Sequence, residues 1–178
     1  MSLETSKAAL RKEYRRHRNQ HSLLFIDDSW LHILNCKELD GVTHVATYIS
    51  YGVEPQTRDI NLQLLASGRI VLVPRMLPDK DLEWVVWNGE SEPTGNAFTD
   101  TVKIGTVIIP ALHIDQEGNR LGQGGGSYDR ALAQLKAGNV WKIALIHHGE
   151  LTSDALPHEP HDQKVDAAAT PNLVVRFK

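Results

Sequence analysis

The chain of 178 residues has little of several features that mark whole classes of proteins. Its one cysteine, Cys36, has no partner for an internal disulfide, and its neighbours predict a small buried residue on a helix. No apolar run approaches the roughly 20 residues of a membrane span. The N-terminus is rich in Lys and Arg where a signal peptide is apolar. We therefore expect a protein of a reducing, cytoplasmic compartment without a membrane partner.

An excess of charge of either sign is missing as well. The 19 Lys and Arg oppose 22 Asp and Glu, which leaves a formal net charge of −3. Such a chain has no global basic field to attract nucleic acid, so any anion must be bound by a local cluster. With 41% hydrophobic and 23% charged residues, the sequence predicts one globular domain over residues 1–178, as a monomer or a weak dimer.

What the sequence does contain is an alternation of helical and extended segments. We expect Ser6 to cap the first helix and Thr57 the third, and Gly68 to end the third. The stretch from residue 156 to residue 170 has the composition of a loop. The segments predict helices over 6–20, 28–39, 57–67 and 131–135, and strands over 43–51, 70–74, 82–87, 107–112, 141–146 and 173–177.

Because the central strands are continuous apolar runs, we expect an α/β fold, a single-domain three-layer sandwich. Its sheet should be mostly parallel or mixed, with helices on both faces. Ligands in such folds bind at the carboxyl ends of the strands. Polar residues follow the predicted strand ends at 51–54, Arg75, 113–115 and 147–150, and we expect them to line one crevice.

The most informative segment is Asn119-Arg120-Leu121-Gly122-Gln123-Gly124-Gly125-Gly126-Ser127-Tyr128-Asp129-Arg130. Four glycines fall within five positions, after a predicted strand and before a predicted helix. Glycine lets a ligand approach the main chain closely. The first amides of a helix have no internal partners and carry the positive end of its dipole. This order predicts an anion site, and phosphate is the usual anion.

Other glycine motifs fit the segment less well. A flexible surface loop seldom opens a helix between two arginines. A Walker loop requires Gly-Lys-Ser/Thr, and the segment contains no lysine. In a dinucleotide fingerprint Gly122 and Gly124 fit, but Ser127 stands where the third glycine belongs. Glu150 follows at roughly the spacing of about 20 residues expected for a ribose-binding acid. A dinucleotide-dependent oxidoreductase therefore stays open as an alternative.

Four segments in order make the chain similar to the 5-formyltetrahydrofolate cyclo-ligase family, also called methenyltetrahydrofolate synthetases. The resemblance covers nearly the whole length and implies a fold that resembles the NagB/RpiA/CoA-transferase-like fold. The glycine segment is the most specific of the four. The segments are residues 7–11, 48–54, 120–130 and 161–166, the last followed by Thr170-Pro171.

The resemblance implies an ATP-dependent, Mg²⁺-requiring ligase of folate metabolism. Its substrate is 5-formyltetrahydrofolate, with or without a polyglutamate tail, and its products are 5,10-methenyltetrahydrofolate, ADP and phosphate. Because a formamide oxygen is a poor leaving group, the γ-phosphoryl group is first transferred to it. N10 then attacks the activated carbon and phosphate departs. Such a transfer needs positioning and charge neutralisation more than a protein nucleophile.

The same resemblance implies the residues that bind ATP. Lys7 and Arg11 lie four residues apart, on one face of the first helix, which by itself describes an ordinary solvated face. In the family this face contacts the phosphates, and Arg11 also lies near the folate. Arg120 and Tyr128 are implied as catalytic. The complete set expected at ATP is Lys7, Arg11, Arg120, Gly122, Gly124, Gly125, Gly126, Ser127 and Tyr128.

On the folate side, Glu54 corresponds to an acid that accepts hydrogen bonds from the pterin ring. Trp84 and Trp87 could stack on the pterin or pack in the core, and Arg75 could face the glutamate tail or a phosphate. The residues implied for the folate are Arg11, Ile49, Tyr51, Glu54 and Gln123, although Ile49 also suits the core.

Asp129 and Asp166 are the implied Mg²⁺ ligands, because Mg²⁺ prefers carboxylate and phosphate oxygens. Without the resemblance, Asp129 would be an acid favoured by the helix dipole and Asp166 a turn residue. The histidine pairs His17 and His21, and His158 and His161, lack the partners of a zinc site.

The chain departs from the family pattern at two positions. Ser127 stands where the family usually has an aromatic residue, and Gln123 where an arginine, aromatic residue or methionine is common. A lost ring weakens stacking on the pterin by about 1 kcal/mol. A folate- or nucleotide-binding regulatory paralogue without turnover therefore stays open as a second alternative.

Overall fold

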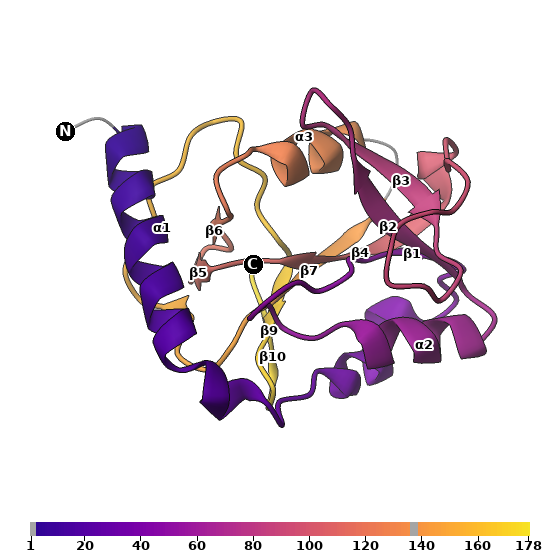
Figure 1. Ribbon diagram of the computed structural model, residues 1–178, viewed down its shortest axis with the longest axis horizontal. Helices are drawn as coiled ribbons and strands as arrows, with labels where there is room; N and C mark the ends of the chain where they lie inside the picture. Colours follow the sequence, from indigo (N-terminus) through magenta and orange to yellow (C-terminus); the bar gives the residue numbers. More distant parts are fainter. Residues whose placement is uncertain (1–2, 136–138) are drawn as a thin grey trace.

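The computed structural model describes residues 3–135 and 139–178, with side chains from residue 6 on, as an α/β protein built on a seven-stranded sheet (Figure 1). The strand order is β10-β9-β7-β4-β1-β2-β3. The five inner strands run parallel, and the edge strands β3 and β10 are antiparallel to their neighbours. The strands are β1 (His44–Ala46), β2 (Ile70–Met76), β3 (Leu82–Val86), β4 (Ile104–Pro110), β7 (Trp141–Leu145), β9 (Ala167–Ala169) and β10 (Val174–Arg176).

Helices cover both faces of this sheet, as the sequence predicts. The helix α2 (Arg58–Ala66) and two 3-10 helices pack on one face, and α3 (Ser127–Gln134) packs on the other. Successive residues of a strand contribute side chains to the two cores in turn, because they point to opposite faces of the sheet. In β4, Ile108 belongs to the core under α2, whereas Val107 and Ile109 belong to the core under α3.

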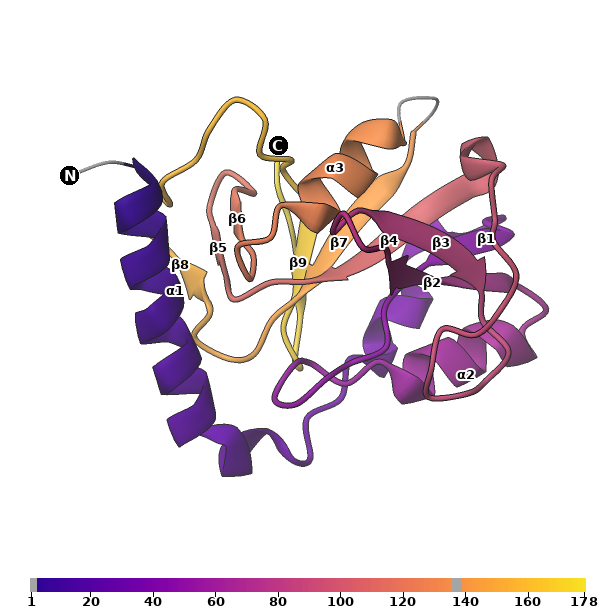
Figure 2. The same ribbon diagram turned by 45° about the horizontal axis from the view of Figure 1, so that its top comes forward.

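A second, three-stranded sheet lies beside the first, in the order β6-β5-β8. It consists of β5 (His113–Asp115), β6 (Arg120–Leu121) and β8 (Leu151–Thr152). The long helix α1 (Leu3–Gln20) runs along this small sheet at one side of the molecule (Figures 1 and 2). Tyr14 of α1 stacks on His113 of β5, with ring centroids 3.5 Å apart. Within the described residues, no helix combines the length and the apolar character that crossing a bilayer would require.

The predicted helix over residues 28–39 is wrong. The segment forms two 3-10 helices, Leu31–Asn35 and Lys37–Leu39, joined at the extended residue Cys36. The cause is a burial period of three, since Trp30, Ile33, Cys36 and Leu39 all pack into the core under α2. Side chains three apart eclipse in a 3-10 helix but drift around an α-helix.

Other element predictions need smaller corrections. α1 begins at Leu3, so Ser6 lies inside the helix and does not cap it. β1 ends at Ala46, and the residues from 47 to 51 form an irregular segment. The loop predicted from residue 156 to residue 170 contains the strand β9. The glycine loop does not follow β4 directly, because the β5–β6 hairpin intervenes.

The helix α2 shows how a predicted cap is used differently. Thr57 stands at its N-cap, but its side chain makes no capping hydrogen bond. The hydroxyl Oγ1 donates instead to the Tyr48 carbonyl at 2.6 Å. This bond fixes the irregular segment that follows β1. Gly68 follows the helix with φ of 83°, in the left-handed region that ends helices. The position of α2 is thus confirmed, while Thr57 serves the segment at the carboxyl end of β1.

Candidate active site

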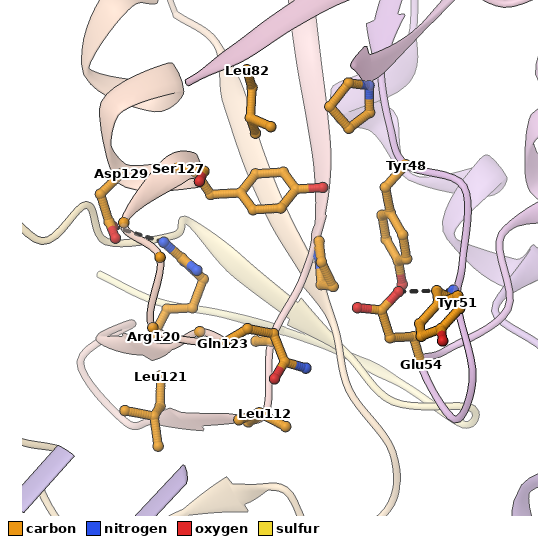
Figure 3. Close-up of a pocket in the computed structure, with 18 of the residues that line it drawn as sticks. Tyr48, Tyr51, Glu54, Leu82, Leu112, Arg120, Leu121, Gln123, Ser127 and Asp129 are labelled. Carbon is orange, nitrogen blue, oxygen red and sulfur yellow. Dashed lines mark hydrogen bonds and ion pairs between the residues drawn. The ribbon is translucent and has the colours of Figure 1, made fainter. Parts of the chain in front are cut away.

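A cavity of about 660 Å³ opens at the carboxyl ends of β1, β2 and β4 (Figure 3). Its position agrees with the rule for ligand sites in parallel sheets. Segments far apart in the sequence meet around it. The wall comes from α1, from residues 48–54, from the ends of β2 and β4, from residues 91–93, from residues 120–129 and from residues 159–162.

The glycine loop, residues 122–126, forms one side of this cavity. Gly124 has φ of 108° and Gly126, the N-cap of α3, has φ of 66°, a region that favours glycine. A Cβ atom at Gly124 would lie 3.3 Å from the Arg11 guanidinium, so the helix α1 also presses close to the loop. Among the described residues, the amides of Gly124, Gly125 and Gly126 have no acceptor within hydrogen-bonding distance. These N–H groups suit an anion.

Arg120 lies beside the loop with its side chain only 3% exposed. Its Nη2 donates to Asp129 Oδ1 at 2.7 Å, and the same oxygen accepts the Gln163 amide at 3.0 Å. Its Nε is buried without an acceptor in the described part of the chain. A buried guanidinium nitrogen without an acceptor carries the cost of an unmade hydrogen bond, which an anionic ligand would remove.

The helix α1 supplies the other cations of the cavity wall. Lys7 is buried, and its Nζ donates to Glu159 Oε2 at 2.9 Å and Asp162 Oδ2 at 2.5 Å. Burial lowers the pKa of Lys7, but the bonds to Asp162 and Glu159 outweigh it, so the pKa is raised. Arg11 donates from Nε to the Gly122 carbonyl at 3.2 Å. Both predicted phosphate ligands of α1 therefore lie at the cavity, where Lys7 is held by carboxylates.

A third residue of α1, Arg18, anchors the helix at the bottom of the cavity. Its Nε and Nη2 donate to the two Glu150 carboxylate oxygens at 2.8 and 2.6 Å. Nη2 also donates to the Ala111 carbonyl at 2.6 Å, and Glu150 accepts the His147 amide at 2.7 Å. Both side chains are buried. Glu150 is thus committed to Arg18, and it does not line the cavity.

Across the cavity from Arg120 lie Glu54, Tyr48 and Tyr51 (Figure 3). Burial raises the pKa of Glu54, although the Tyr51 amide, which donates to its Oε2 at 2.9 Å, and Arg18 act in the opposite direction. The Tyr48 hydroxyl donates to the Pro55 carbonyl at 2.8 Å. This side combines one carboxylate with ring and aliphatic surface, which suits a flat ligand with N–H donors.

The residues that depart from the family pattern have partners of their own. The Ser127 hydroxyl donates to the Lys80 carbonyl at 2.6 Å. Gln123 Oε1 accepts from Arg15 Nε at 2.8 Å. Burial, with the nearby charge of Glu54, raises the pKa of Tyr128, so its hydroxyl stays protonated. Tyr128 lines the cavity, where a protonated hydroxyl is able to donate a hydrogen bond.

Asp166 is the one predicted site residue that the structure does not bring to the cavity. It is exposed and immediately precedes β9, at the amino end of that strand. Its main chain and side chain both bond to the amino end of β7, an inner strand of the sheet. The Asp166 amide donates to the Lys142 carbonyl at 2.8 Å, and Asp166 Oδ2 accepts the Lys142 amide at 2.7 Å. A joint Mg²⁺ site of Asp129 and Asp166 is therefore not supported by this placement.

Several weaker candidates also lie elsewhere. Trp84 and Trp87 are buried in the two cores, one on each face of the sheet. Arg75 pairs with Glu83 Oε2 at 2.6 Å outside the cavity wall. The strand-end residues 113–115 and 147–150, expected at the crevice, do not line it either.

Sequence analysis missed Arg18, Tyr48, Glu159 and Asp162, which all line the cavity. A signal for Arg18 exists, because residues 7, 11 and 18 fall on one helical face at 100° per residue. Asp162 lies in the fourth family segment, only four residues before Asp166. Nothing in the sequence shows which of these two acids turns toward Lys7.

The chain belongs to the 5-formyltetrahydrofolate cyclo-ligase family, whose model matches residues 3–171. A curated relative of that name from Mycolicibacterium smegmatis is 32% identical over 143 residues, which cover 71% of this chain and 73% of the relative. The Escherichia coli relative of the same name is 28% identical over 144 residues, covering 73% of this chain and 79% of its own.

Solved structures support the fold. A 5,10-methenyltetrahydrofolate synthetase from Mycoplasma pneumoniae superposes with a TM-score of 0.70 at 21% identity, covering 92% of this chain and 97% of that one. The Aquifex aeolicus 5,10-methenyltetrahydrofolate synthetase gives 0.71 at 22% identity, covering 97% and 93%. At this low sequence identity, the structural similarity supports the fold alone.

The buried pair of Arg18 and Glu150 gives a first prediction. Arg18→Met leaves the Glu150 carboxylate buried without its partner, so we expect a loss of about 3–5 kcal/mol in the free energy of unfolding. Chemical denaturation measures it. The matched variant Arg16→Met, on the same helix at an exposed position, should cost less than about 0.5 kcal/mol. Equal effects of the two variants would contradict the anchoring role of Arg18.

Proposed function

We propose that the protein converts 5-formyltetrahydrofolate to 5,10-methenyltetrahydrofolate in an ATP- and Mg²⁺-dependent reaction that releases ADP and phosphate. Membership of the cyclo-ligase family supports the activity. One observation of the structure carries the proposal. Glycine amides and the buried Arg120 Nε, which have no acceptor in the described part of the chain, line the same cavity as Glu54, which supports an anion site and a pterin site side by side.

The residues divide the work by charge. The glycine-loop amides with Arg120, Arg11 and Lys7 hold the triphosphate and offset charge on the γ-phosphoryl group during transfer to the formyl oxygen. The protonated Tyr128 hydroxyl donates a hydrogen bond to an oxygen at the reacting end. N10 then attacks the formyl carbon, and the C–O bond to phosphate breaks. On their side of the cavity, α1 and the glycine loop limit the entry of water, which would otherwise intercept the activated carbon.

On the folate side, Glu54 accepts hydrogen bonds from the pterin N–H groups. Ile49, Tyr51 and Gln123 border the same half of the cavity and contact the folate there. Because Tyr51 is 86% exposed, the benzoyl-glutamate portion would leave past this rim, so a polyglutamate tail extends into solvent.

Asp129 is the proposed Mg²⁺ ligand from the cavity wall. Its carboxylate lies in the first turn of α3, directly after the glycine loop, and Mg²⁺ binds commonly through one or two carboxylates and substrate phosphates. When bound, the ion supplies charge neutralisation at the phosphates. The proposal includes a cytoplasmic location and a monomeric or weakly dimeric state.

The structure bears differently on the two alternatives, the dinucleotide-dependent oxidoreductase and the regulatory paralogue. Glu150, the acid expected to read a ribose, is locked to Arg18 away from the cavity, which removes the support for a dinucleotide-dependent oxidoreductase. A regulatory paralogue without turnover shares the same cavity, so only an activity measurement separates it from the ligase.

The decisive measurement mixes purified protein, Mg-ATP and 5-formyltetrahydrofolate. We expect the absorbance of the methenyl product to grow, with one phosphate released for each methenyl group. Phosphate release should require the folate, because the formyl oxygen is the acceptor. Binding of both ligands without product would favour the regulatory alternative.

Glu54 makes folate binding dependent on pH. Since burial raises its pKa, Glu54 becomes protonated at a higher pH than an ordinary glutamate and then loses a carboxylate acceptor. We expect KM for 5-formyltetrahydrofolate to rise as pH falls through this raised pKa, starting above the usual Glu range near 4.3. KM for ATP should change little there.

Glu54→Gln tests the same assignment. It should raise KM for the folate by about 10- to 100-fold, the value of a hydrogen bond to a charged group. It should also abolish the acid limb of the folate KM profile. An acid limb that survives in this variant would assign it to another group.

Mg²⁺ dependence tests Asp129 against Asp166. Asp129→Asn should raise the Mg²⁺ concentration needed for half-maximal activity by about tenfold or more, because a charged ligand is lost. Asp166→Asn, which alters a carboxylate outside the cavity wall, is the matched control and should leave it within about twofold. An equal shift in both variants would restore the joint site that the sequence predicts.

A further inference from the structure

Two arginines outside the cavity hold carbonyl groups of the glycine loop. Arg15 Nη2 donates to the Gln123 carbonyl at 2.5 Å, and Arg130 Nη1 donates to the Gly125 carbonyl at 3.2 Å. Neither arginine belongs to the cavity wall, whereas the loop residues they hold do. Both guanidinium groups therefore approach the loop from its outer side.

Because the peptide units are planar and trans, the direction of each held carbonyl sets the direction of the next N–H group. The C=O of one residue and the N–H of the next point in opposite directions in a planar trans unit. The described chain has no cis peptide bond. Because Arg15 fixes the Gln123 carbonyl outward, the Gly124 N–H points inward. Because Arg130 fixes the Gly125 carbonyl outward, the Gly126 N–H points inward too.

These two inward amides are among those without an acceptor in the described part of the chain. A run of glycines would otherwise sample many orientations, since glycine has the largest backbone freedom of any residue. An unheld loop would lose that freedom each time it bound a phosphate, and the loss would weaken binding. The two arginines restrict this backbone freedom before the phosphate binds.

Each of the two arginines makes further contacts that fix its own side chain. Arg15 also donates from Nε to Gln123 Oε1 at 2.8 Å, so both its contacts fall on one residue. Arg130 pairs through Nε with Asp81 and donates from Nη2 to the Lys80 carbonyl at 2.9 Å. The turn after β2 therefore acts as a second support for the loop.

We propose that Arg15 and Arg130 are positioning residues that aim the Gly124 and Gly126 amides at the nucleotide phosphates. Neither residue needs to touch the ligand, since each acts through a loop carbonyl. This rests on the proposed function in so far as a nucleotide occupies the glycine loop. It also explains how a glycine loop without a lysine is kept in a phosphate-binding shape.

The test compares Arg15→Ala and Arg130→Ala with Arg16→Ala. Arg16 carries the same charge on α1 next to Arg15 and is exposed, and its side chain makes no hydrogen bond or ion pair among the described residues. We expect the dissociation constant of Mg-ATP, measured by calorimetry without folate, to rise about 3- to 10-fold in each of the first two variants, the range for one or two lost hydrogen bonds. Arg16→Ala should stay within about twofold, since its surface position carries no contact.

A second readout separates positioning from direct phosphate contact. In the nucleotide-free protein, the ¹H–¹⁵N resonance of Gly124 should shift in Arg15→Ala, and that of Gly126 in Arg130→Ala, while Arg16→Ala leaves both unchanged. Arg15→Lys, which keeps the charge and one donor, should recover part of the affinity. In Arg130→Ala, whose lost loop contact is to Gly125 and not to Gln123, KM for 5-formyltetrahydrofolate should stay near the wild-type value.

The outcomes are distinct. Weaker nucleotide binding with unmoved glycine resonances would overturn positioning, because it indicates direct contact. Wild-type affinity in both variants would also overturn the inference. Absence of Mg-ATP binding by the wild-type protein would instead remove the proposed function, whereas Mg-ATP binding without folate turnover leaves the positioning test intact.

Discussion

The buried bidentate pair of Arg18 and Glu150 is the interaction on which the site depends. It ties α1 to the Ala111 carbonyl and, through Glu150, to the His147 amide at the end of β7. Two buried charges cost several kcal/mol of desolvation each, and the pair offsets this only because both carboxylate oxygens accept a guanidinium donor. Together with the bonds of Lys7 to Glu159 and Asp162, this anchor holds α1 over the glycine loop.

The glycine loop and α1 form a single electrostatic unit. The loop offers amide dipoles and no lysine, so fixed positive charge comes from Arg120 inside the loop segment and from α1 across it. Two of these charges already have anionic partners, since Lys7 pairs with Glu159 and Asp162 and Arg120 pairs with Asp129. Under the proposed function, a triphosphate would replace these partners, so its net binding free energy would be smaller than the new contacts alone would give.

The sequence predicts the fold and the core of the site where a local pattern carries the information. The central strands follow from apolar runs, and the loop that lines the cavity follows from glycines at 122–126 before a helix. The pattern fails where tertiary packing decides. A burial period of three gives residues 31–39 3-10 instead of α geometry, and Asp166 bonds to Lys142 at the amino end of β7, outside the cavity wall. Asp162, not Asp166, meets Lys7, and no local rule chooses between them.

The contacts of α1 also bear on the order in which the protein is made. Arg18 and Glu150 are separated by 132 positions, and Lys7 and Glu159 by 152. Because both carboxylate partners lie much later in the chain, α1 leaves the ribosome well before residues 150 and 159 are synthesised. At roughly 5–20 residues per second, Lys7 and Arg18 stay without these partners for many seconds. The many charged side chains of α1 keep the helix hydrated until the residues that it contacts have been synthesised.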